Sequence, residues 1–375
     1  MPVYCGLDFG TSNTAISLLC TDANGNVLEH KIIAVEPSVI YFPAGGIFNE
    51  AYYVGNEAIE KYIQDNMKGR LIKSIKSLLP YSEYKYTIIN KKPYQPDDIL
   101  MWIFRHFKKQ VELYLAEQQM ETEITGTCIG RPVYFSEDAE SDQLAEKRIM
   151  NAAHMAGFKE YHLVFEPVAA LYGYHLPVRT DDIILMADLG AGTSDFTLIE
   201  NYQPGQVSAG DCIVRENFVS EGIHTGGDDF DTALFLHKIT KHFGQGTRYE
   251  SWGKWLVVPE YIYFQISNWV QLNQLKTIKF LEQLKEIKRS SNHKTKIQNL
   301  ITLIESNLAY PLFKAIEAAK ISLSSREIAG IRFSYEGNRK IGETAEIDIN
   351  EVISLQGFNR IIEPEVKKIG DTVNL

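Results

Sequence analysis

Two stretches of the chain, residues 3–19 and 183–199, share one order of hydrophobic and polar positions. In each stretch an apolar run ends near an acidic residue, a glycine-rich bend follows, and a second alternating run leads back. Alternation on both sides of a short glycine bend predicts a β-hairpin. The acidic residue before the bend is Asp8 in the first copy and Asp188 in the second.

The bends of the two predicted hairpins have a composition suited to binding an anion. Glycines allow backbone N–H groups to approach a negative charge closely, and Thr193 adds a hydroxyl donor to the second bend. A carboxylate cannot itself hold a phosphate, but Asp188 can hold a hydrated Mg²⁺ that does so. One glycine-rich bend after a strand is most often only a turn. Two matching copies favour a duplicated fold that binds one nucleotide between its halves.

The remaining pattern mixes strands with amphipathic helices and predicts an α/β protein. Strands are expected over residues 27–35, 36–42, 127–135, 207–219, 331–335 and 344–349. Helices are expected over residues 97–119, 136–157, 252–325 and 350–368. In the helix over 136–157, Ser136 is the expected N-cap and Gly157 the expected stop.

Composition and charge narrow the class of protein. With 375 residues, 45% of them hydrophobic and 23% charged, the chain is expected to form two lobes of a globular protein. The formal net charge of −10 argues against nonspecific nucleic-acid binding. The start has no basic, apolar leader, and no apolar run approaches membrane-spanning length, so we expect a cytoplasmic protein. The scattered cysteines are expected to be reduced thiols: Cys5, Cys20, Cys128 and Cys212.

Three further stretches contain candidate binding residues, and each also has a plain structural interpretation. The basic, apolar segment 69–80 contains lysines that a solvated surface explains equally well. Glu166 precedes Pro167 at a predicted helix start, where a carboxylate can simply be a cap. The Gly226-Gly227 turn leads into an acidic helix start, which suits an anion only if a metal intervenes.

Together and in this order, these pieces resemble the actin-like ATPases, and within them the nucleotide-binding domain of the DnaK (heat-shock-protein-70) chaperone family. The resemblance extends from residue 3 to about residue 370, and the IGRP sequence at residues 129–132 is similar to the short YegD-like branch. The motifs that carry it are GLDFGTSN at 6–13, EPVAA at 166–170, DLGAGTSD at 188–195, HTGGDDFD at 224–231 and EAAKISLSS at 317–325.

The resemblance implies a duplicated ribonuclease-H-like fold, with two lobes around a nucleotide cleft. Lobe I is expected over residues 1–178 with an inserted subdomain at about 37–115, and lobe II over 179–375 with an inserted helical subdomain at about 228–358. The family continues into a strand, a Gly-Gly-x-x-R loop and a closing helix that this sequence does not contain. We therefore expect the C-terminal part of lobe II to be missing, and a peptide-binding domain to be missing with it.

The resemblance also implies a role for each matching residue. Asp8 and Asp188 would hold Mg²⁺ through water. Lys76, rather than Lys73, would stabilise charge on the transferred phosphoryl group, and Glu166 would position or deprotonate the attacking water. The implied catalytic set is Lys76, Glu166, Asp188 and Thr193. The implied nucleotide-binding set is Asp8, Gly10, Thr11, Ser12, Asn13, Gly190, Ala191, Gly192, Gly226, Gly227, Asp228, Glu317, Lys320 and Ser324.

Within this set, Glu317, Lys320 and Ser324 would line the adenosine, Asp231 would lie across the cleft, and Pro132 would be the hinge proline. Two positions depart from the family pattern. Ala191 replaces a glycine of the second bend, which is tolerable if its φ is negative. Ile321 stands where many relatives have an arginine that stacks on the adenine.

The function that the resemblance implies is a DnaK-like chaperone module that binds and hydrolyses ATP and depends on Mg²⁺. Its cofactors would be ATP or ADP and Mg²⁺. Its partners would be the nucleotide and a co-chaperone or exchange factor, with neither nucleic acid nor a membrane. Two alternatives remain open: a regulatory or degenerate nucleotide-binding module without significant turnover, and a sugar kinase or filament-forming actin relative.

Overall fold

The computed structural model of the chain describes residues 1–45, 51–120, 122–173, 183–199, 218–267, 275–336 and 346–373. The chain forms two compact units, one of residues 1–225 with 372–375 and one of residues 226–371. The expected lobe boundary at residues 178 and 179 lies outside the described residues and stays a prediction. The mixed α/β class expected from the sequence is confirmed.

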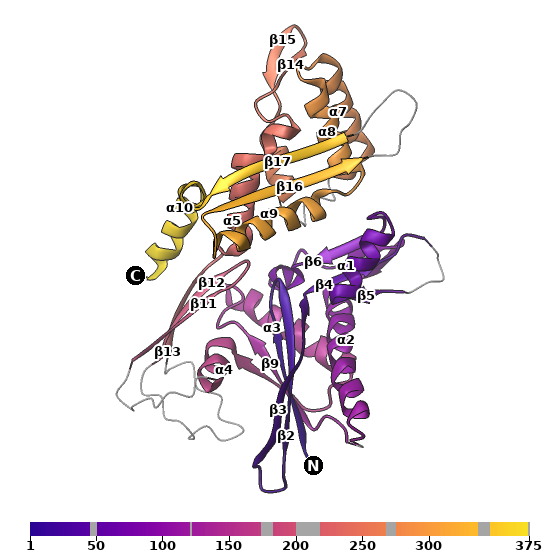
Figure 1. The fold of residues 1–375 in the computed structure, drawn as a ribbon. Helices are drawn as coiled ribbons and strands as arrows, with labels where there is room; N and C mark the ends of the chain where they lie inside the picture. Colours follow the sequence, from indigo (N-terminus) through magenta and orange to yellow (C-terminus); the bar gives the residue numbers. More distant parts are fainter. Residues whose placement is uncertain are drawn as a thin grey trace. The chain divides into compact units, whose positions relative to one another are not determined.

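The first unit is built on a five-stranded mixed sheet (Figure 1). In spatial order its strands are β10 (Tyr161–Phe165), β9 (Gly126–Arg131), β1 (Val3–Phe9), β2 (Asn13–Thr21) and β3 (Val27–Pro37). β1 and β2 form the first predicted hairpin, and β9 lies parallel to β1 and β10. Side chains alternate between the faces of β1, so Val3, Leu7 and Phe9 are all buried.

Two helices, α2 (Pro96–Glu117) and α3 (Ala139–Ala156), pack against each other and form the core with the buried side chains of this sheet (Figure 1). Phe104 of α2 meets Phe9 of β1 edge to face, with 5.3 Å between the ring centroids. α3 begins later than expected. Its N-cap is Asp138 and not Ser136, because the Asp138 carboxylate accepts the N–H of Ser141. Gly157 ends α3 in the left-handed conformation, as expected.

Smaller elements lie between β3 and α2. They are β4 (Val39–Phe42), β5 (Tyr53–Val54), α1 (Gly55–Gln64), β6 (Arg70–Lys73), the 3-10 turn η1 (Ile75–Leu78), β7 (Thr87–Ile89) and β8 (Lys92–Tyr94). β4 pairs with β5 on one side and with β6 on the other. The basic segment 69–80 is therefore a paired strand followed by a 3-10 turn that carries Lys76.

The second predicted hairpin is also present in the first unit. It consists of β11 (Ile184–Leu189) and β12 (Ser194–Ile199), and β13 (Phe218–Ile223) pairs with the far side of β12 (Figure 1). α4 (Glu166–Gly173) begins directly after β10. Of the strand expected over 207–219, residues 207–217 lie outside the described residues.

The second unit is mainly helical (Figure 1). Its elements are α5 (Gly227–Leu234), the π-helical turn η3 (Phe235–Ile239), the 3-10 turn η4 (Thr240–Phe243), β14 (Arg248–Ser251), β15 (Lys254–Val257), α6 (Tyr261–Ser267), α7 (Ile278–Ser290), α8 (Lys294–Glu305), α9 (Ala309–Leu323), β16 (Ile328–Glu336), β17 (Glu346–Ser354) and α10 (Leu355–Val373). The predicted pairing of the strands around 331–335 and 344–349 is confirmed by β16 and β17.

Two helix boundaries predicted in the second unit are wrong. The helix expected from Trp252 starts only at Tyr261, because β14 and β15 form a hairpin whose turn is Trp252-Gly253. Both turn residues have positive φ, 53° and 72°, which is the conformation of a two-residue hairpin turn. The helix expected from residue 350 starts at Leu355, because residues 350–354 continue the β17 ladder.

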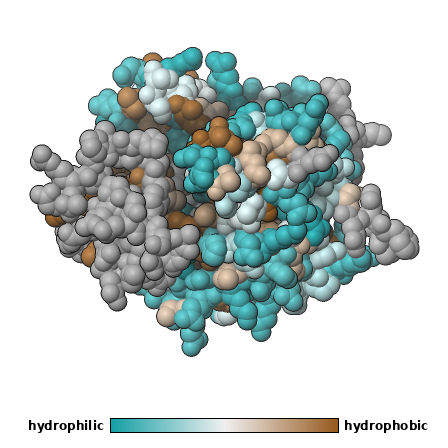
Figure 2. All heavy atoms as spheres, turned by 90° about the horizontal axis from the view of Figure 1, so that it is seen from below, coloured by the Kyte–Doolittle hydropathy of each residue, from teal (hydrophilic) through white to brown (hydrophobic). Residues whose placement is uncertain are grey.

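No helix in the described part of the chain is long and apolar enough to cross a membrane. Hydrophilic residues predominate on the face shown in Figure 2, where hydrophobic residues form only small patches.

Candidate active site

The bends of the two hairpins have the same backbone geometry. In the first, Gly10 N–H donates to the Asn13 carbonyl at 3.0 Å, and in the second, Gly190 N–H donates to the Thr193 carbonyl at 2.9 Å. In each case the acidic residue lies one position before the last residue of its strand. Asp8 is paired across its hairpin with Ala15, whereas Asp188 is paired with Asp195.

The glycines that start the bends are required for space. A methyl group on Gly10 would overlap the Asn13 carbonyl oxygen, and one on Gly190 would lie 3.1 Å from the Thr193 carbonyl oxygen. Neither glycine has a positive φ, so close approach of the turn's own carbonyl is the constraint. Ala191 has no positive φ either, and its methyl group fits without backbone strain.

The two bends face each other. A methyl group placed on Gly192 would lie 3.5 Å from Thr11 Cγ2 and 4.0 Å from Thr11 Oγ1. Among the described residues, the N–H groups of Thr11, Ser12, Ala191 and Gly192 donate to no other group. Backbone donors that meet in this way form a concave surface suited to a polyphosphate.

Lys76 and Glu166 form an ion pair beside these bends. Lys76 Nζ lies 2.7 Å from Glu166 Oε1, and the two side chains are only 11% and 18% exposed. Of the two lysines considered from the sequence, Lys76 is thus the one that meets Glu166. Asp8 and Asp188 are near enough to act electrostatically on Glu166.

The acidic groups of this cluster influence one another. Burial raises the pKa of Glu166; Lys76 opposes this rise, and Asp8 and Asp188 add to it. Asp8 is an exposed residue, yet desolvation of its carboxylate also raises its pKa; Lys76 opposes this rise, and Asp188 adds to it. Four acidic groups and one lysine therefore share one electrostatic environment, in which a bound cation would be favoured. They are Asp8, Glu166, Asp188, Asp195 and Lys76.

Asp195 belongs to this cluster although the sequence analysis gave it no role of its own. Burial raises its pKa, a hydrogen bond from Thr193 lowers it, and Asp188 raises it again. Gly222 lies opposite Asp195 in β13, where a methyl group would overlap the carboxylate. The signal in the sequence was a second acidic residue shortly after the bend. The first hairpin has Ala15 at the equivalent position.

Local backbone features direct Lys76 and Glu166 toward each other. Ser74 adopts a left-handed conformation with φ of 58°, which turns the chain from β6 into η1. Glu166 packs over β9 at Gly130, where a methyl group would lie 3.3 Å from Glu166 Cγ. A methyl group at residue 130 would therefore require Glu166 to shift by a few tenths of an ångström.

Ser38 supports the first bend and was not identified from the sequence as part of the site. Its hydroxyl donates to the Gly10 carbonyl at 2.7 Å and lies 2.7 Å from Thr14 Oγ1. Its backbone N–H donates to the Ser12 carbonyl at 2.8 Å. These bonds fix the carbonyl groups of the bend, so its N–H groups remain directed outward.

The candidate adenosine residues lie in the second unit. Lys320 Nζ of α9 contacts Asp231 Oδ2 at 2.7 Å and the Gly227 carbonyl at 2.8 Å, which ties α9 to the start of α5. Burial raises the pKa of Asp231 to about 6 despite the ion pair, and Asp231 Oδ1 is buried without a hydrogen-bond partner. The nearby carboxylates of Asp228 and Glu317 also raise this pKa, whereas Lys320 lowers it.

The remaining residues of this set lie near Lys320. Glu317, Lys320, Ile321 and Ser324 follow one another at the i, i+3, i+4 and i+7 spacing of a single helix face. Ser324 is the exposed C-cap of α9, and the Ile321 side chain is 61% exposed. At the start of α5, Gly226 is the N-cap, and its N–H donates to Asp229 Oδ2 at 2.8 Å.

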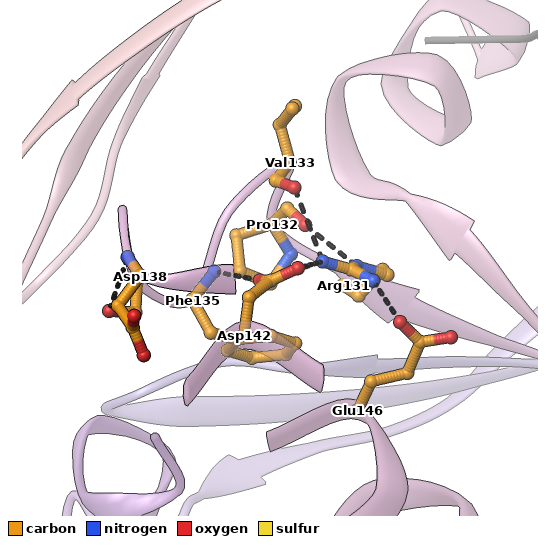
Figure 3. A network of polar contacts seen from close by, with 8 residues as sticks. Arg131, Pro132, Val133, Phe135, Asp138, Asp142 and Glu146 are labelled. Atoms are coloured by element: carbon orange, nitrogen blue, oxygen red, sulfur yellow. Dashed lines mark hydrogen bonds and ion pairs between the residues drawn. The ribbon is translucent and has the colours of Figure 1, made fainter. Parts of the chain in front are cut away.

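The candidate hinge, Pro132, lies in a network that the sequence analysis missed (Figure 3). Arg131 donates to the carbonyls of Pro132 and Val133 at 3.0 and 3.2 Å, and it pairs with Asp142. The signal in the sequence was an arginine at the end of a mostly apolar strand, because a buried charge requires partners.

The residues present fit a hydrated metal better than a directly ligated one. Asp8 and Asp188 lie one residue before the ends of β1 and β11, close to the bends whose N–H groups are described above, and carboxylate oxygens are the ligands that Mg²⁺ prefers. Among the described residues, no group of three or more His, Cys, Asp or Glu side chains forms a direct metal cage.

Comparison with known proteins places this geometry in a family. The family model described as Hsp70 protein matches residues 4–251. The chain is 32% identical to the chaperone protein DnaK of Thermosipho melanesiensis over 61% of this chain and 34% of that protein. It is 28% identical to that of Thermosipho africanus, over 97% of this chain and 53% of that protein. It is 25% identical to the chaperone protein dnaK of Cyanidium caldarium, over 96% of this chain and 55% of that protein.

The chain thus spans about half the length of the relatives that it matches from end to end. The matched range 4–251 includes both hairpins, Lys76 and Glu166. The comparisons do not distinguish a YegD-like branch, which stays a prediction. Because the family model covers well over half of the sequence, this chain belongs to the Hsp70 family, whose nucleotide-binding domain has the actin-like ATPase fold.

Proposed function

We propose that this chain binds ATP with Mg²⁺ between the bends of its two hairpins and hydrolyses it to ADP and phosphate. The observation that carries the proposal is the Lys76–Glu166 ion pair in the electrostatic environment of Asp8 and Asp188. Perturbed carboxylates beside a fixed lysine are typical of a catalytic site.

The phosphates are the part of the nucleotide that these bends suit best. The N–H groups of residues 11–12 and 191–192 would donate to phosphate oxygens, with the hydroxyls of Thr11, Ser12 and Thr193 beside them. Asp8 and Asp188 would hold Mg²⁺ through water. When bound, Mg²⁺ neutralises charge on the phosphate oxygens.

Lys76 and Glu166 would have different tasks. The Glu166 carboxylate, whose pKa burial raises, would orient the attacking water and accept its proton. Lys76 would supply a fixed positive charge where negative charge develops on the transferred phosphoryl group. Their contact keeps both groups in place before the nucleotide arrives.

In the second unit, the face of α9 with Glu317, Lys320 and Ser324 would line one side of the adenosine. Gly226, Gly227 and Asp228 at the start of α5 would complete the nucleotide-binding set, and Lys320 holds α5 to α9. We keep the lobe boundary near residue 178 and a co-chaperone or exchange factor as parts of this proposal, supported by family membership.

The test is ATP turnover by the whole chain before and after Lys76→Ala, with Lys73→Ala as the matched control. Loss of a fixed charge at the transferred group is expected to lower kcat by about 100-fold or more. Lys73→Ala is expected to stay near wild type, because Lys73 lies in β6 before the turn that directs Lys76 to Glu166. Equal turnover by wild type and Lys76→Ala would exclude this mechanism.

A regulatory module that binds nucleotide without turnover is the second candidate. The exposed Ile321 favours it, because isoleucine cannot give the cation–π stacking on adenine that an arginine provides. Calorimetry with Mg-ADP decides between weak and tight binding. Sub-micromolar affinity would contradict the reading of a degenerate site.

A further inference from the structure

The Arg131 guanidinium is among the most completely satisfied charged groups in the first unit (Figure 3). It is 4% exposed. Nε donates to the Pro132 carbonyl, Nη1 to Glu146, and Nη2 to the Val133 carbonyl and to both oxygens of Asp142. Asp142 in turn accepts the N–H of Phe135 at 2.7 Å.

Arg131 also lies close to Glu166, because it is paired with the residue that precedes Glu166. It is paired with Phe165 in the parallel ladder of β9 and β10, and Glu166 is the next residue along the chain. The guanidinium lies 5.2 Å from the ring centroids of both Phe135 and Phe165. A planar cation between two rings fixes the end of β10, and with it the point from which Glu166 projects.

A second buried arginine does the same for Lys76. Arg148, 7% exposed, donates to the carbonyls of Leu79, Tyr81 and Tyr84 at 2.7, 3.1 and 2.9 Å. A longer contact of 3.5 Å reaches the carbonyl of Leu78. Leu78 is the last residue of η1, the turn that carries Lys76, so Arg148 anchors the chain directly after that turn.

Both anchors converge on α3. Asp142 and Glu146, which hold Arg131, and Arg148 itself all belong to this one helix. α3 is capped at its start by Asp138 and packs against α2. Lys76 and Glu166 come from parts of the chain 90 residues apart, and α3 contacts the supports of both.

We propose that α3 is a common support that sets the distance between Lys76 and Glu166, with Arg131 and Arg148 as positioning residues. The inference rests on the proposed ATPase function. Neither arginine needs to touch the nucleotide. Each holds backbone carbonyls in the forked geometry that only a guanidinium provides, so lysine is not an equivalent replacement.

The experiment compares Arg131→Lys, Arg148→Lys and the control Arg105→Lys in the whole chain. Arg105 is an exposed arginine that donates to the Met155 carbonyl at 3.1 Å, near the other end of α3. For the two buried arginines we expect kcat to fall about 10- to 100-fold with KM for Mg-ATP nearly unchanged, as for a catalytic pair displaced by about 1 Å. Arg105→Lys is expected to match wild type.

A second measurement does not depend on turnover. The rate at which acetic anhydride modifies the Lys76 amine, followed by mass spectrometry, is expected to rise several-fold in both variants, because the ion pair with Glu166 loosens. Lys320, which lies in the other unit, serves as the internal reference. Where Arg131→Lys fails to fold, Glu146→Gln removes one partner of Arg131 that is 37% exposed and keeps Asp142.

The outcomes separate this inference from the proposed function. A wild type that hydrolyses no ATP overturns the proposed function, and the labelling rates still decide whether α3 supports the pair. A wild type that turns over ATP, with kcat and Lys76 labelling unchanged in both arginine variants, overturns the inference alone. In a Lys76→Ala background, Arg148→Lys is expected to lower kcat no further. A further loss of kcat in the double variant would count against the inference that Arg148 acts through Lys76.

Discussion

The two hairpins have nearly the same bend but very different surroundings. β1 lies inside a five-stranded sheet under α2 and α3, and its inward side chains are fully buried. β11 is at one side of a three-stranded sheet, with Leu185 53% exposed and Leu189 65% exposed. The bonds from Gly10 to Asn13 and from Gly190 to Thr193 nevertheless agree within 0.1 Å.

This difference shows that the shape of the glycine bend and the burial of its strands have separate causes. The bend follows from a glycine that lets a carbonyl approach its own turn, and it forms with or without a covering layer. The burial of β1 depends on β9 and on two helices that come much later in the chain. Substitutions in the two hairpins can therefore test each cause alone.

The largest difference is expected for stability. Phe9→Ala empties a fully buried site against Phe104 and should cost about 3–5 kcal/mol of unfolding free energy. Leu189→Ala, at the equivalent place in the second hairpin, should change it by less than about 0.5 kcal/mol, because the side chain is already in solvent. Urea unfolding of the two variants checks this, and equal losses would contradict the contrast.

The second-largest difference between the two hairpins is expected for nucleotide affinity. Gly10→Ala places a methyl group on the Asn13 carbonyl oxygen and breaks the turn, so we expect Mg-ADP affinity to fall about 100-fold, as when several backbone donors are lost. Gly190→Ala leaves 3.1 Å to the Thr193 carbonyl, and a small shift relieves it. A loss of only a few-fold is expected there, measured by calorimetry. A larger loss of affinity in Gly190→Ala than in Gly10→Ala would show that the second bend is the stiffer one.

Asp231, a carboxylate outside both hairpins, shows the effect of burial on the pKa of an acidic group. The pKa of Asp231 is raised from 3.8 to about 6, so its proton stabilises the folded state below about pH 4, and this stabilisation is lost as the pH rises through 6. The groups that act on it are Lys320, Asp228 and Glu317. Wild type should lose on the order of 2 kcal/mol relative to Asp231→Asn between pH 4 and 7. Urea unfolding at each pH measures this difference. If the unfolding free energies of wild type and Asp231→Asn changed equally with pH, the raised pKa would be excluded.

The smallest expected effect concerns the one acidic difference between the hairpins. Asp195 accepts a hydrogen bond from Thr193, and the first hairpin has Ala15 in its place. Asp195→Ala should weaken Mg-ATP binding about 3- to 10-fold, the value of one hydrogen bond that holds the Thr193 hydroxyl. Asp195→Asn keeps the acceptor and should bind like wild type. Titration of both variants measures the contrast, and a tighter-binding Asp195→Ala would refute it.

Local patterns predicted the hairpins and α2 correctly, because alternation and helical spacing are properties of a few neighbouring residues. The N-cap of α3 was misplaced by two residues, because Ser136 and Asp138 are both good caps. The β14–β15 hairpin was missed, because its turn is a tryptophan followed by glycine and not a common turn pair.

The candidate site could be predicted residue by residue only through its motifs. Contact between Lys76 and Glu166 depends on segments far apart in the chain, and no local pattern encodes it. The supporting residues Ser38, Arg131 and Arg148 were missed for the same reason. Each acts on backbone carbonyls of a distant or turning segment, and a carbonyl has no sequence signature.

The parallel pairing of β1 with β9 has a consequence for the synthesis of the protein. Thr125 N–H donates to the Val3 carbonyl, and the two residues are 122 positions apart. At the usual elongation rate of about 5–20 residues per second, a ribosome needs on the order of ten seconds to produce β9 after β1. During that interval the edge of β1 that later pairs with β9 has no partner strand, although β1 is the first strand to leave the ribosome.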